Sequence, residues 1–350
     1  MVPSGGGVQV AGKGYGWNPL AGRAIGPTPF HAAGDPSNGG FGGAPTWPAP
    51  PGHGDTVPMQ LHLLDATYEL FRAHFGRPPS TDVRGRPAGA TIGLVESVLR
   101  LMRDPGVTHL GCATDHVIRS WRNERYAGYK TEAGMPPELL AQFELAEEAL
   151  RALGLVVWPM IEYEADDALA TAAARWADSP GMERVVILSP DKDLAQCVRQ
   201  DGRVVAFDRR RERTIDADAV RARFGVDPES IPDWLALVGD AADGFPGLRG
   251  WGERSASAVL NRYVHLDAIP EAARAWDVSV RNADALAATL RTGRAEALLY
   301  RELATLRTDV PLPEELDDLT WRGVPREPFS RLVSELRAPH LLGRVPRWQA

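Results

Sequence analysis

Short apolar runs alternate with segments of helical periodicity along the middle of the chain, and this alternation restricts the fold more than any other feature. The apolar runs are typical of buried strands in a parallel sheet, whose two faces are both covered. Strand, helix and strand in succession predict right-handed crossovers and a three-layer α/β domain with a mostly parallel sheet. The expected strands lie at residues 61–65, 108–114, 155–158, 185–189 and 204–208, and the expected helices at 89–103, 137–153 and 164–177.

Two changes in pattern divide the 350 residues. Residues 1–57 hold 15 of the 35 glycines and 9 of the 29 prolines but only four charged residues, so we expect a disordered Gly/Pro-rich tail there. From about residue 216 onward the pattern becomes almost wholly helical. We therefore expect the α/β domain over residues 58–215 and a helical subdomain over residues 216–345.

Composition excludes several classes of protein. No apolar run reaches the roughly 18 to 20 residues that cross a bilayer. The two cysteines, Cys112 and Cys197, lie inside apolar stretches, which leaves neither a disulfide framework nor a set of thiolates for structural zinc. We therefore expect an intracellular, cytoplasmic protein. The formal net charge of −7 would by itself argue against a nucleic-acid partner.

Carboxylates gather where the predicted strands end. Asp65 ends the first strand, Asp115 follows the second, and Asp191 and Asp193 follow the fourth. Because ligands of open α/β sheets bind at the carboxyl ends of the strands, these four acids should converge on one rim. Five more acids stand at the start of a helix and at the start of the helical region: Glu164, Asp166 and Asp167 in YEADDALA, and Asp240 and Asp243 in VGDAADGFPG.

Each acid taken alone has an ordinary explanation in helix capping, turn chemistry or loop solvation. Nine carboxylates at one rim, however, would repel one another and raise one another's pKa unless cations lay among them. Mg²⁺ or Mn²⁺ suits such oxygen ligands, and two ions about 3.5 to 4 Å apart are the usual device for hydrolysing phosphodiesters. A phosphatase that forms an aspartyl-phosphate usually has a second Asp two residues after the strand-end Asp. This chain has Thr67 there, which counts against that class of phosphatase.

These motifs and their order resemble the 5′-nuclease domain of bacterial DNA polymerase I and the related stand-alone 5′-3′ exonucleases and flap endonucleases. The similarity covers about residues 61–312 and rests on LLDATYELFRAHF, GRPAGA, EADDALA, SPDKDLAQ, LVGDAADGFPGLRGWGERSA and LATLRTDVPLP. Because no polymerase domain follows in the sequence, we expect the stand-alone exonuclease to be the nearer relative. The resemblance implies a PIN-like α/β domain over residues 58–215, with a helix-hairpin-helix in the helical subdomain that follows.

The resemblance also implies roles for individual residues. It makes Asp65, Arg72 and Lys130 catalytic, and it places five metal ligands nearer the catalytic ion and four nearer the second. The first group is Asp65, Asp115, Glu164, Asp166 and Asp167, and the second is Asp191, Asp193, Asp240 and Asp243. The presence of all nine favours an active enzyme, because degenerate relatives lose some of the later acids.

A glycine-rich turn opens a helix at PGLRGWGERSA. The free N–H groups and the positive dipole end of such a helix suit a phosphate, although glycines that merely permit positive φ in a tight turn are the plain alternative. In the family that the chain resembles, this hairpin grips the duplex backbone, often with a bound monovalent cation, which makes K⁺ a further candidate cofactor. The implied DNA contacts are Gly247, Arg249, Gly250, Gly252 and Arg254.

Basic and aromatic residues interleave over about residues 116–136, a pattern that suits a single strand because its bases stack while its phosphates are neutralised. By resemblance this segment is the arch through which an unpaired 5′ end reaches the metals. The implied contacts are Arg119, Arg125, Tyr129 and Lys130. The family's arginine three residues after this lysine is Ala133 here, which weakens the expected phosphate steering. A second departure is Gly244, where the family usually has Asn.

Another basic run, at residues 209–213, is more typical of a solvated loop than of a binding site, and we assign it no role.

We therefore expect a divalent-metal-dependent 5′-to-3′ exonuclease with 5′-flap endonuclease capacity, acting in replication or repair on DNA with a free or flapped 5′ end. Three rival functions stay open: a branched-DNA-binding protein with little catalysis, a PIN-like ribonuclease, and, weakest, a metal phosphatase acting on a small molecule. The net charge is no obstacle to a DNA partner. Two divalent ions would offset four of the negative charges, and binding depends on where the basic residues gather.

Overall fold

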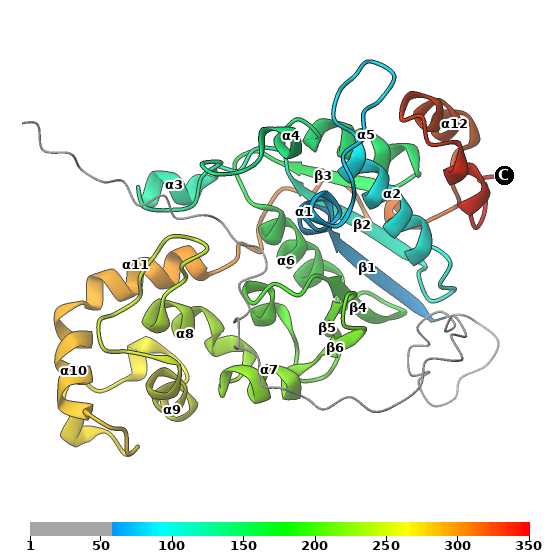
Figure 1. The fold of residues 1–350 in the computed structure, drawn as a ribbon. Coiled ribbons are helices and arrows are strands. Elements are labelled where there is room, and N and C mark those ends of the chain that lie inside the picture. The colour runs from blue at the N-terminus through cyan, green and yellow to red at the C-terminus, as the bar shows by residue number, and fades with distance from the viewer. Residues whose placement is uncertain (1–57) are drawn as a thin grey trace, which may run out of the picture.

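The computed structural model describes residues 58–350, so the predicted tail over residues 1–57 lies outside the described part of the chain. Within the described residues, six strands form one sheet in the order β3-β2-β1-β4-β5-β6 (Figure 1). The first five run parallel, which confirms the predicted mostly parallel sheet. The strands are β1 Met59–Asp65, β2 His109–Asp115, β3 Val156–Met160, β4 Met182–Leu188, β5 Val204–Asp208 and β6 Arg213–Ile215.

The edge strand β6 is absent from the sequence-based prediction. It is three residues long, pairs antiparallel with β5, and carries a charged side chain, Arg213, rather than an apolar run. Short, charged strands are typical of sheet edges, where they prevent pairing with a further strand, and they lack the periodic signal of buried strands.

The sheet separates two apolar cores because side chains alternate along its strands. In β1, Leu61 and Leu63 face one core and Leu64 faces the other. Helix α6 (Ala165–Trp176) covers the first face. The second face is covered by α1 (Ala66–Gly76), α2 (Gly89–Leu101) and α5 (Phe143–Ala152), which completes the predicted three layers.

The helix expected over residues 137–153 is divided in two. Helix α4 (Pro137–Leu140) ends before α5 begins, and Gln142 lies between them. The Gln142 side chain donates to the carbonyl of Glu138 (2.8 Å) and accepts from the backbone N–H of Thr91 (3.1 Å) in the first turn of α2. Gln142, at the break between α4 and α5, thus supplies a partner for an N–H group that α2 itself leaves unpaired.

The helical subdomain follows the sheet and packs on the α6 side. Its apolar core, which includes Trp234, Leu260 and Leu303, is continuous with the core formed by α6 and the sheet. Its main helices are α7 Ala217–Phe224, α8 Ile231–Val238, α9 Glu253–Tyr263, α10 Ala283–Thr292 and α11 Arg294–Ala304. The short α3 (Trp121–Arg125), in the predicted arch, lies beside α11 (Figure 1).

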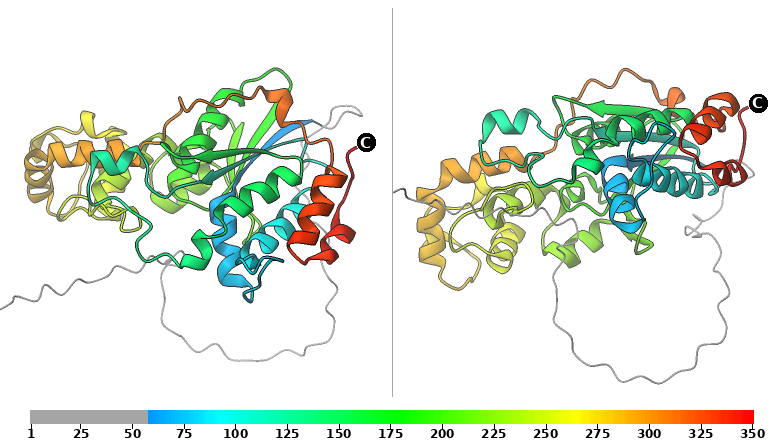
Figure 2. Two further views of the ribbon diagram at one scale, coloured as in Figure 1. Left: turned by 90° about the horizontal axis from the view of Figure 1, so that it is seen from above. Right: turned by 45° about the horizontal axis from the view of Figure 1, so that its top comes forward.

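The last part of the chain returns to the sheet domain, which differs from the predicted extent of the helical subdomain to residue 345. Helix α12 (Arg326–Glu335) lies beside α5, away from the subdomain (Figure 2). The N–H of Trp321 donates to the carbonyl of Thr108 (3.0 Å), and Phe329 is fully buried in the core on the α1 side. Among the described residues no helix combines the length and the apolar character needed to cross a membrane.

Candidate metal centre and nucleic-acid interface

The carboxylate of Asp65 stands at the junction of β1 and α1. It caps α1 by accepting the N–H of Tyr68 (2.8 Å), and its second oxygen accepts the hydroxyl of Ser189 after β4 (2.8 Å). Burial is the largest cause that raises the pKa of Asp65 to about 7, and the negative charges of Asp115 and Asp191 act in the same direction. The hydroxyl of Ser189 also accepts the N–H of Asp191 (3.2 Å), so these strand-end acids lie close together, as the sequence predicts.

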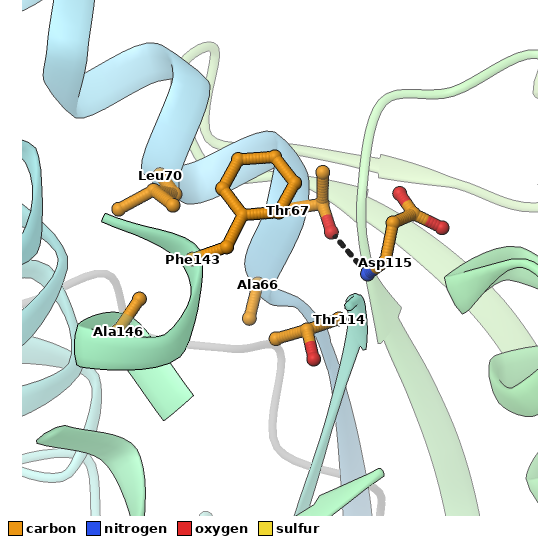
Figure 3. Close-up of a pocket in the computed structure, with 7 residues that line it drawn as sticks. All are labelled: Ala66, Thr67, Leu70, Thr114, Asp115, Phe143 and Ala146. Carbon is orange, nitrogen blue, oxygen red and sulfur yellow. Dashed lines mark hydrogen bonds between the residues drawn. The ribbon is translucent and has the colours of Figure 1, made fainter. Parts of the chain in front are cut away.

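Asp115, the last residue of β2, is fixed by its neighbours on both sides. Its N–H donates to the hydroxyl of Thr67 (2.8 Å), and its carboxylate accepts the N–H of Ala165 (2.8 Å) at the start of α6. Figure 3 shows the Thr67 contact, with the carboxylate directed away from the apolar side chains of Leu70 and Phe143. Burial raises the pKa of Asp115 to about 6.

Two acids of the α6 N-terminus face these carboxylates. Glu164 is the N-cap residue of α6, and its carboxylate accepts the hydroxyl of Ser120 (2.8 Å) and pairs with the ammonium of Lys130 (2.8 Å). Asp166 lies nearer the strand ends. Burial raises its pKa well above the ordinary value, and the charges of Asp191 and Asp65 add to this effect. Asp166 is therefore a carboxylate that a cation would stabilise.

Asp167 has a different role in this structure from the metal ligand that the resemblance implies. Its two oxygens accept the Nη1 and Nη2 groups of Arg122 (2.7 and 2.8 Å), together with the N–H groups of Glu164 (3.1 Å) and Arg307 (2.9 Å). Both side chains of the Arg122–Asp167 pair are buried, at 1% and 0% exposure. Asp167 therefore serves as the counter-ion of Arg122 and links the arch, α6 and the segment after α11.

A second group of acids forms a compact trio. Asp193, Asp240 and Asp243 each offer an oxygen, and these oxygens all lie within 4.8 Å of one another. Asp240 and Asp243 meet because the chain closes on itself: the N–H of Asp240 donates to the carbonyl of Phe245 (2.8 Å), and that of Phe245 to the carbonyl of Asp240 (3.0 Å). A bridged loop therefore brings them to one side.

The electrostatics of the trio favour a cation. Burial raises the pKa of Asp193 well above its ordinary value against the opposing charge of Lys192, and burial also raises that of Asp240. For Asp243, burial would raise the pKa, but the ammonium groups of Lys130 and Lys192 hold it below the ordinary value. The Oδ1 atom of Asp193 is buried and accepts no hydrogen bond from the described residues. Buried carboxylate oxygens of this kind fit a hard divalent ion.

Asp191 links the trio to the strand-end acids. Its N–H donates to the hydroxyl of Ser189 (3.2 Å), which also donates to Asp65, and its carboxylate accepts the N–H of Asp193 (2.9 Å). Eight of the nine predicted ligands thus lie in two neighbouring groups, and Asp167 stands apart in its pair with Arg122.

Two lysines lie among these acids. Lys130 pairs with Glu164 and with Asp243 (3.1 Å), which places its ammonium between the two groups of acids. Lys192 was not singled out from the sequence, yet its ammonium pairs with Asp240 and lies 3.5 Å from Asp193 Oδ1. The available signal was its place between the two acids of SPDKD, because every side chain of that short turn must lie near the rim.

The arch differs in part from its predicted role. Tyr129 is 3% exposed, and its hydroxyl donates to Glu164 (3.4 Å), so it supports the site from within and is not available to stack on a base. Arg119 and Arg125 are on the surface, where they pair with Glu132 (3.1 Å) and with Glu302 of α11 (2.7 Å). The two arginines remain accessible to a nucleic-acid strand.

Arg72 contacts neither of the two groups of acids directly. Its guanidinium pairs with Glu69 and donates to the hydroxyl of Ser97 (2.9 Å). Arg209 of the basic run contacts the same two residues, at 3.2 Å from the Glu69 carboxylate and 3.0 Å from the Ser97 hydroxyl, and its side chain is 13% exposed. Arg209 is thus a packed residue rather than part of a solvated loop, because Glu69 supplies its partner charge.

The predicted helix-hairpin-helix consists of α8, a glycine loop and α9. Gly247 has φ +69°, and a Cβ there would lie 2.4 Å from the backbone N of Gly239, so only glycine fits this crossing. The residues implied as DNA contacts on the far side of the loop, namely Arg249, Gly250, Gly252 and Arg254, are all exposed. A phosphate can therefore reach this turn and the first turn of α9.

Gly244 has a structural explanation. Its φ is +92°, and a Cβ would lie 2.2 Å from the carbonyl oxygen of Gly128 in the arch. The adjacent N–H of Lys130 donates to the carbonyl of Asp243 (3.0 Å), so the arch and the acidic loop touch backbone to backbone. The departure from Asn thus allows a close contact between the two segments.

Comparison with known proteins agrees with this arrangement. Residues 60–225 match the model of the 5′-3′ exonuclease N-terminal resolvase-like domain, and residues 226–327 match that of the 5′-3′ exonuclease C-terminal SAM fold. DNA polymerase I of Pseudomonas aeruginosa is 36% identical over 299 residues, which cover 82% of this chain and 31% of the polymerase. The 5′-3′ exonuclease of Aquifex aeolicus is 28% identical over 82% of this chain and 95% of its own length.

Solved structures share the fold at low sequence identity. The T5 D15 protein co-crystallised with metal ions superposes with a TM-score of 0.58 at 14% identity, covering 82% of this chain and 99% of that one. The catalytic core of Rad2 in complex with DNA substrate gives a TM-score of 0.53 at 11% identity, covering 82% and 90%. The two family models together span most of the chain, and the protein belongs to the 5′-3′ exonuclease family.

Proposed function

We propose that this protein is a divalent-metal-dependent 5′-3′ exonuclease with 5′-flap endonuclease activity on DNA. The observation that carries the proposal is that two sets of carboxylates converge between two segments suited to nucleic acid. These segments are the arch and the helix-hairpin-helix. The chain spans 31% of the length of the Pseudomonas aeruginosa polymerase that it matches, so the proposal concerns the 5′-nuclease activity only.

Two groups of side chains would hold the ions. Asp65, Asp115, Glu164 and Asp166 would bind the catalytic ion, and Asp191 with the trio of Asp193, Asp240 and Asp243 would bind the second. Two such ions, when bound, supply the positive charge that activates a water molecule and stabilises the leaving oxygen. Mg²⁺ is the proposed metal because every donor is a carboxylate oxygen, and Mn²⁺ shares this preference.

The chain's own cations would position the DNA. The exposed Arg249 and Arg254 flank the turn that opens α9, where N–H groups and the helix dipole favour a duplex phosphate. A monovalent cation such as K⁺ could bind the same turn. Lys130, between Glu164 and Asp243, would contact the phosphate nearest the ions, and Arg119 and Arg125 would guide the unpaired 5′ strand.

The test is an assay with three substrates. The purified chain is incubated with Mg²⁺ and a 5′-flap duplex labelled at the flap end, with single-stranded RNA, and with a chromogenic phosphomonoester. We expect metal-dependent release of labelled DNA fragments. Substituting a residue that only hydrogen-bonds to a metal ligand typically lowers activity by roughly 10- to 100-fold. Asp65→Asn and Asp240→Asn change proposed ligands themselves, so they should lower the rate by more than this. Asp317→Asn, which changes an exposed acid elsewhere, should leave the rate unchanged.

Each other outcome selects a rival function. DNA binding without any cleavage, equal in the parent and in Asp65→Asn, would indicate a branched-DNA-binding protein. Cleavage of RNA alone would indicate a ribonuclease, and release of free phosphate alone a phosphatase. We also propose a cytoplasmic location, in keeping with the free thiols of Cys112 and Cys197, whose pKa values are raised by burial.

A further inference from the structure

Lysine is rare in this chain, and its placement is selective. Only three of the 39 basic residues are lysines: Lys13, Lys130 and Lys192. Lys13 lies outside the described residues, and the other two both lie among the metal-site carboxylates. A lysine ammonium is a compact, strongly hydrated charge on a flexible stem, whereas a guanidinium is a planar fork that binds carboxylates in a fixed geometry. The site therefore combines carboxylates with the basic group that can withdraw most easily.

The ammonium of Lys192 lies beside two carboxylates of the trio. It pairs with Asp240 Oδ2 and lies 3.5 Å from Asp193 Oδ1, and both acids belong to the set whose oxygens lie within 4.8 Å of one another. A divalent ion needs these oxygens at about 2.0 to 2.1 Å if it is Mg²⁺. An ammonium and a divalent ion cannot both occupy that space, because they would compete for the same lone pairs and repel each other.

We propose that Lys192 is a built-in counter-ion of the Asp193, Asp240 and Asp243 trio, which a divalent ion must displace in order to bind. The proposal rests on the proposed function, since it takes these carboxylates to be the ligands of the second ion. In the metal-free protein the ammonium offsets the repulsion among three buried carboxylates. The second ion therefore binds more weakly than the ligand set alone would allow, and the fold does not depend on it.

Withdrawal of Lys192 is sterically feasible. Its side chain is 26% exposed, so part of the stem borders the solvent. The residue lies in the turn between β4 and the short 3₁₀ helix Asp193–Cys197, rather than inside a helix whose backbone would limit its movement. The acids that face it are Asp240 and Asp243 of the helical subdomain, while Asp191 and Asp193 flank it in the chain.

The test measures binding of Mn²⁺ alone to the full chain, without DNA. Isothermal titration calorimetry compares the parent with Lys192→Met, which keeps the stem and removes the charge, and with Lys192→Arg, which keeps the charge. Arg331→Met on α12 is the control, because it removes one charge from a side chain that is 74% exposed. Thermal unfolding of all four proteins is recorded in EDTA and in saturating Mn²⁺.

We expect Lys192→Met to tighten the weaker Mn²⁺ site by about tenfold or more, as removal of a cation a few ångströms away implies. Its melting temperature should fall in EDTA, and the gain on adding Mn²⁺ should exceed that of the parent, because ligand stabilisation grows with affinity. Lys192→Arg should stay within a few-fold of the parent, and Arg331→Met should match it.

Three results would overturn the inference. If the parent and Lys192→Met bind two ions with equal affinity, Lys192 is not a competitor, although the proposed function stands. If Lys192→Met loses the same stability with and without Mn²⁺, or if Lys192→Arg tightens binding as much as Lys192→Met does, the residue acts through packing. If the parent binds no Mn²⁺, both the inference and the proposed metal site fail.

Discussion

The buried Arg122–Asp167 pair offers a direct test of which acids are structural and which are ligands. Arg122→Met would remove two bonds to Asp167 and two further bonds, to the carbonyl groups of Leu303 (2.7 Å) and Thr305 (3.2 Å). Asp167 would keep its two backbone donors but lose its counter-charge inside the protein. Breaking a buried ion pair in this way costs about 3–5 kcal/mol of unfolding free energy.

The expected loss is large enough to measure by thermal unfolding. For a chain of this size, 1 kcal/mol corresponds to roughly 2–4 °C, so the melting temperature should fall by about 6–20 °C. The control lies three residues away. Arg125 pairs with Glu302 at the surface, with 55% and 43% exposure, and Arg125→Met should cost no more than about 1 kcal/mol. Equal losses in the two variants would refute the distinction between the pairs.

The reciprocal variants separate structural acids from metal ligands. In EDTA, Asp167→Asn should lower the melting temperature, because it leaves Arg122 without its partner charge. Asp65→Asn should raise the melting temperature, because it removes a buried negative charge that Asp115 and Asp191 repel. A rise for Asp167→Asn, or stability gained on adding Mg²⁺ that depends on Asp167 as strongly as on Asp65, would mean that Asp167 is a ligand after all.

Three further predictions follow from the geometry. Gly244→Ala should destabilise the protein by at least twice the roughly 1–2 kcal/mol expected for Gly202→Ala, since both positions have positive φ but only at Gly244 does a Cβ meet backbone; equal melting temperatures would contradict this. Because burial raises the pKa of Asp65 to about 7, its native state binds more protons than the unfolded state between about pH 4 and 7, where the unfolded value is about 3.9. In EDTA the stability of the parent relative to Asp65→Asn should therefore fall as the pH rises through this range, and chemical unfolding at several pH values would show a constant difference if the reasoning is wrong. Arg254→Ala should weaken duplex binding and lower the slope of log affinity against log salt by about 1, measured by fluorescence anisotropy, and an unchanged slope would exclude a phosphate contact.

The sequence was sufficient to predict most of the sheet and the rim of acids, because both depend on local patterns. Each parallel strand is an apolar run, and Asp65, Asp115 and Asp191 follow from where those runs end. The loop of Asp240 and Asp243 was also predictable as a pair, although the bridge that closes it was not. Periodicity and strand ends are properties of neighbouring residues, and no tertiary contact is needed to recognise them.

The rest depends on pairs far apart in the chain. Arg122 and Asp167 are separated by 45 residues. Neither local sequence indicates that these two side chains form a buried ion pair. Arg209 pairs with Glu69, which lies on α1, and the hydroxyl of Tyr129 donates to Glu164. A charged or aromatic residue looks exposed in sequence until its partner is known, and here the partner comes from another layer of the fold.

The loop between α8 and α9 carries two functions at a fixed separation. Asp240 lies at its start and Arg249 near its end, and the N–H of Leu248 donates to the carbonyl of Leu237 (2.9 Å), so the two sites share one rigid crossing of the backbone. In the proposed enzyme, the same loop that holds the duplex also supplies ligands for the second ion. The fixed separation of the two sites would then set the distance between the bound duplex and the phosphodiester that is cut. The position of the cut would depend on the duplex rather than on the end of the strand.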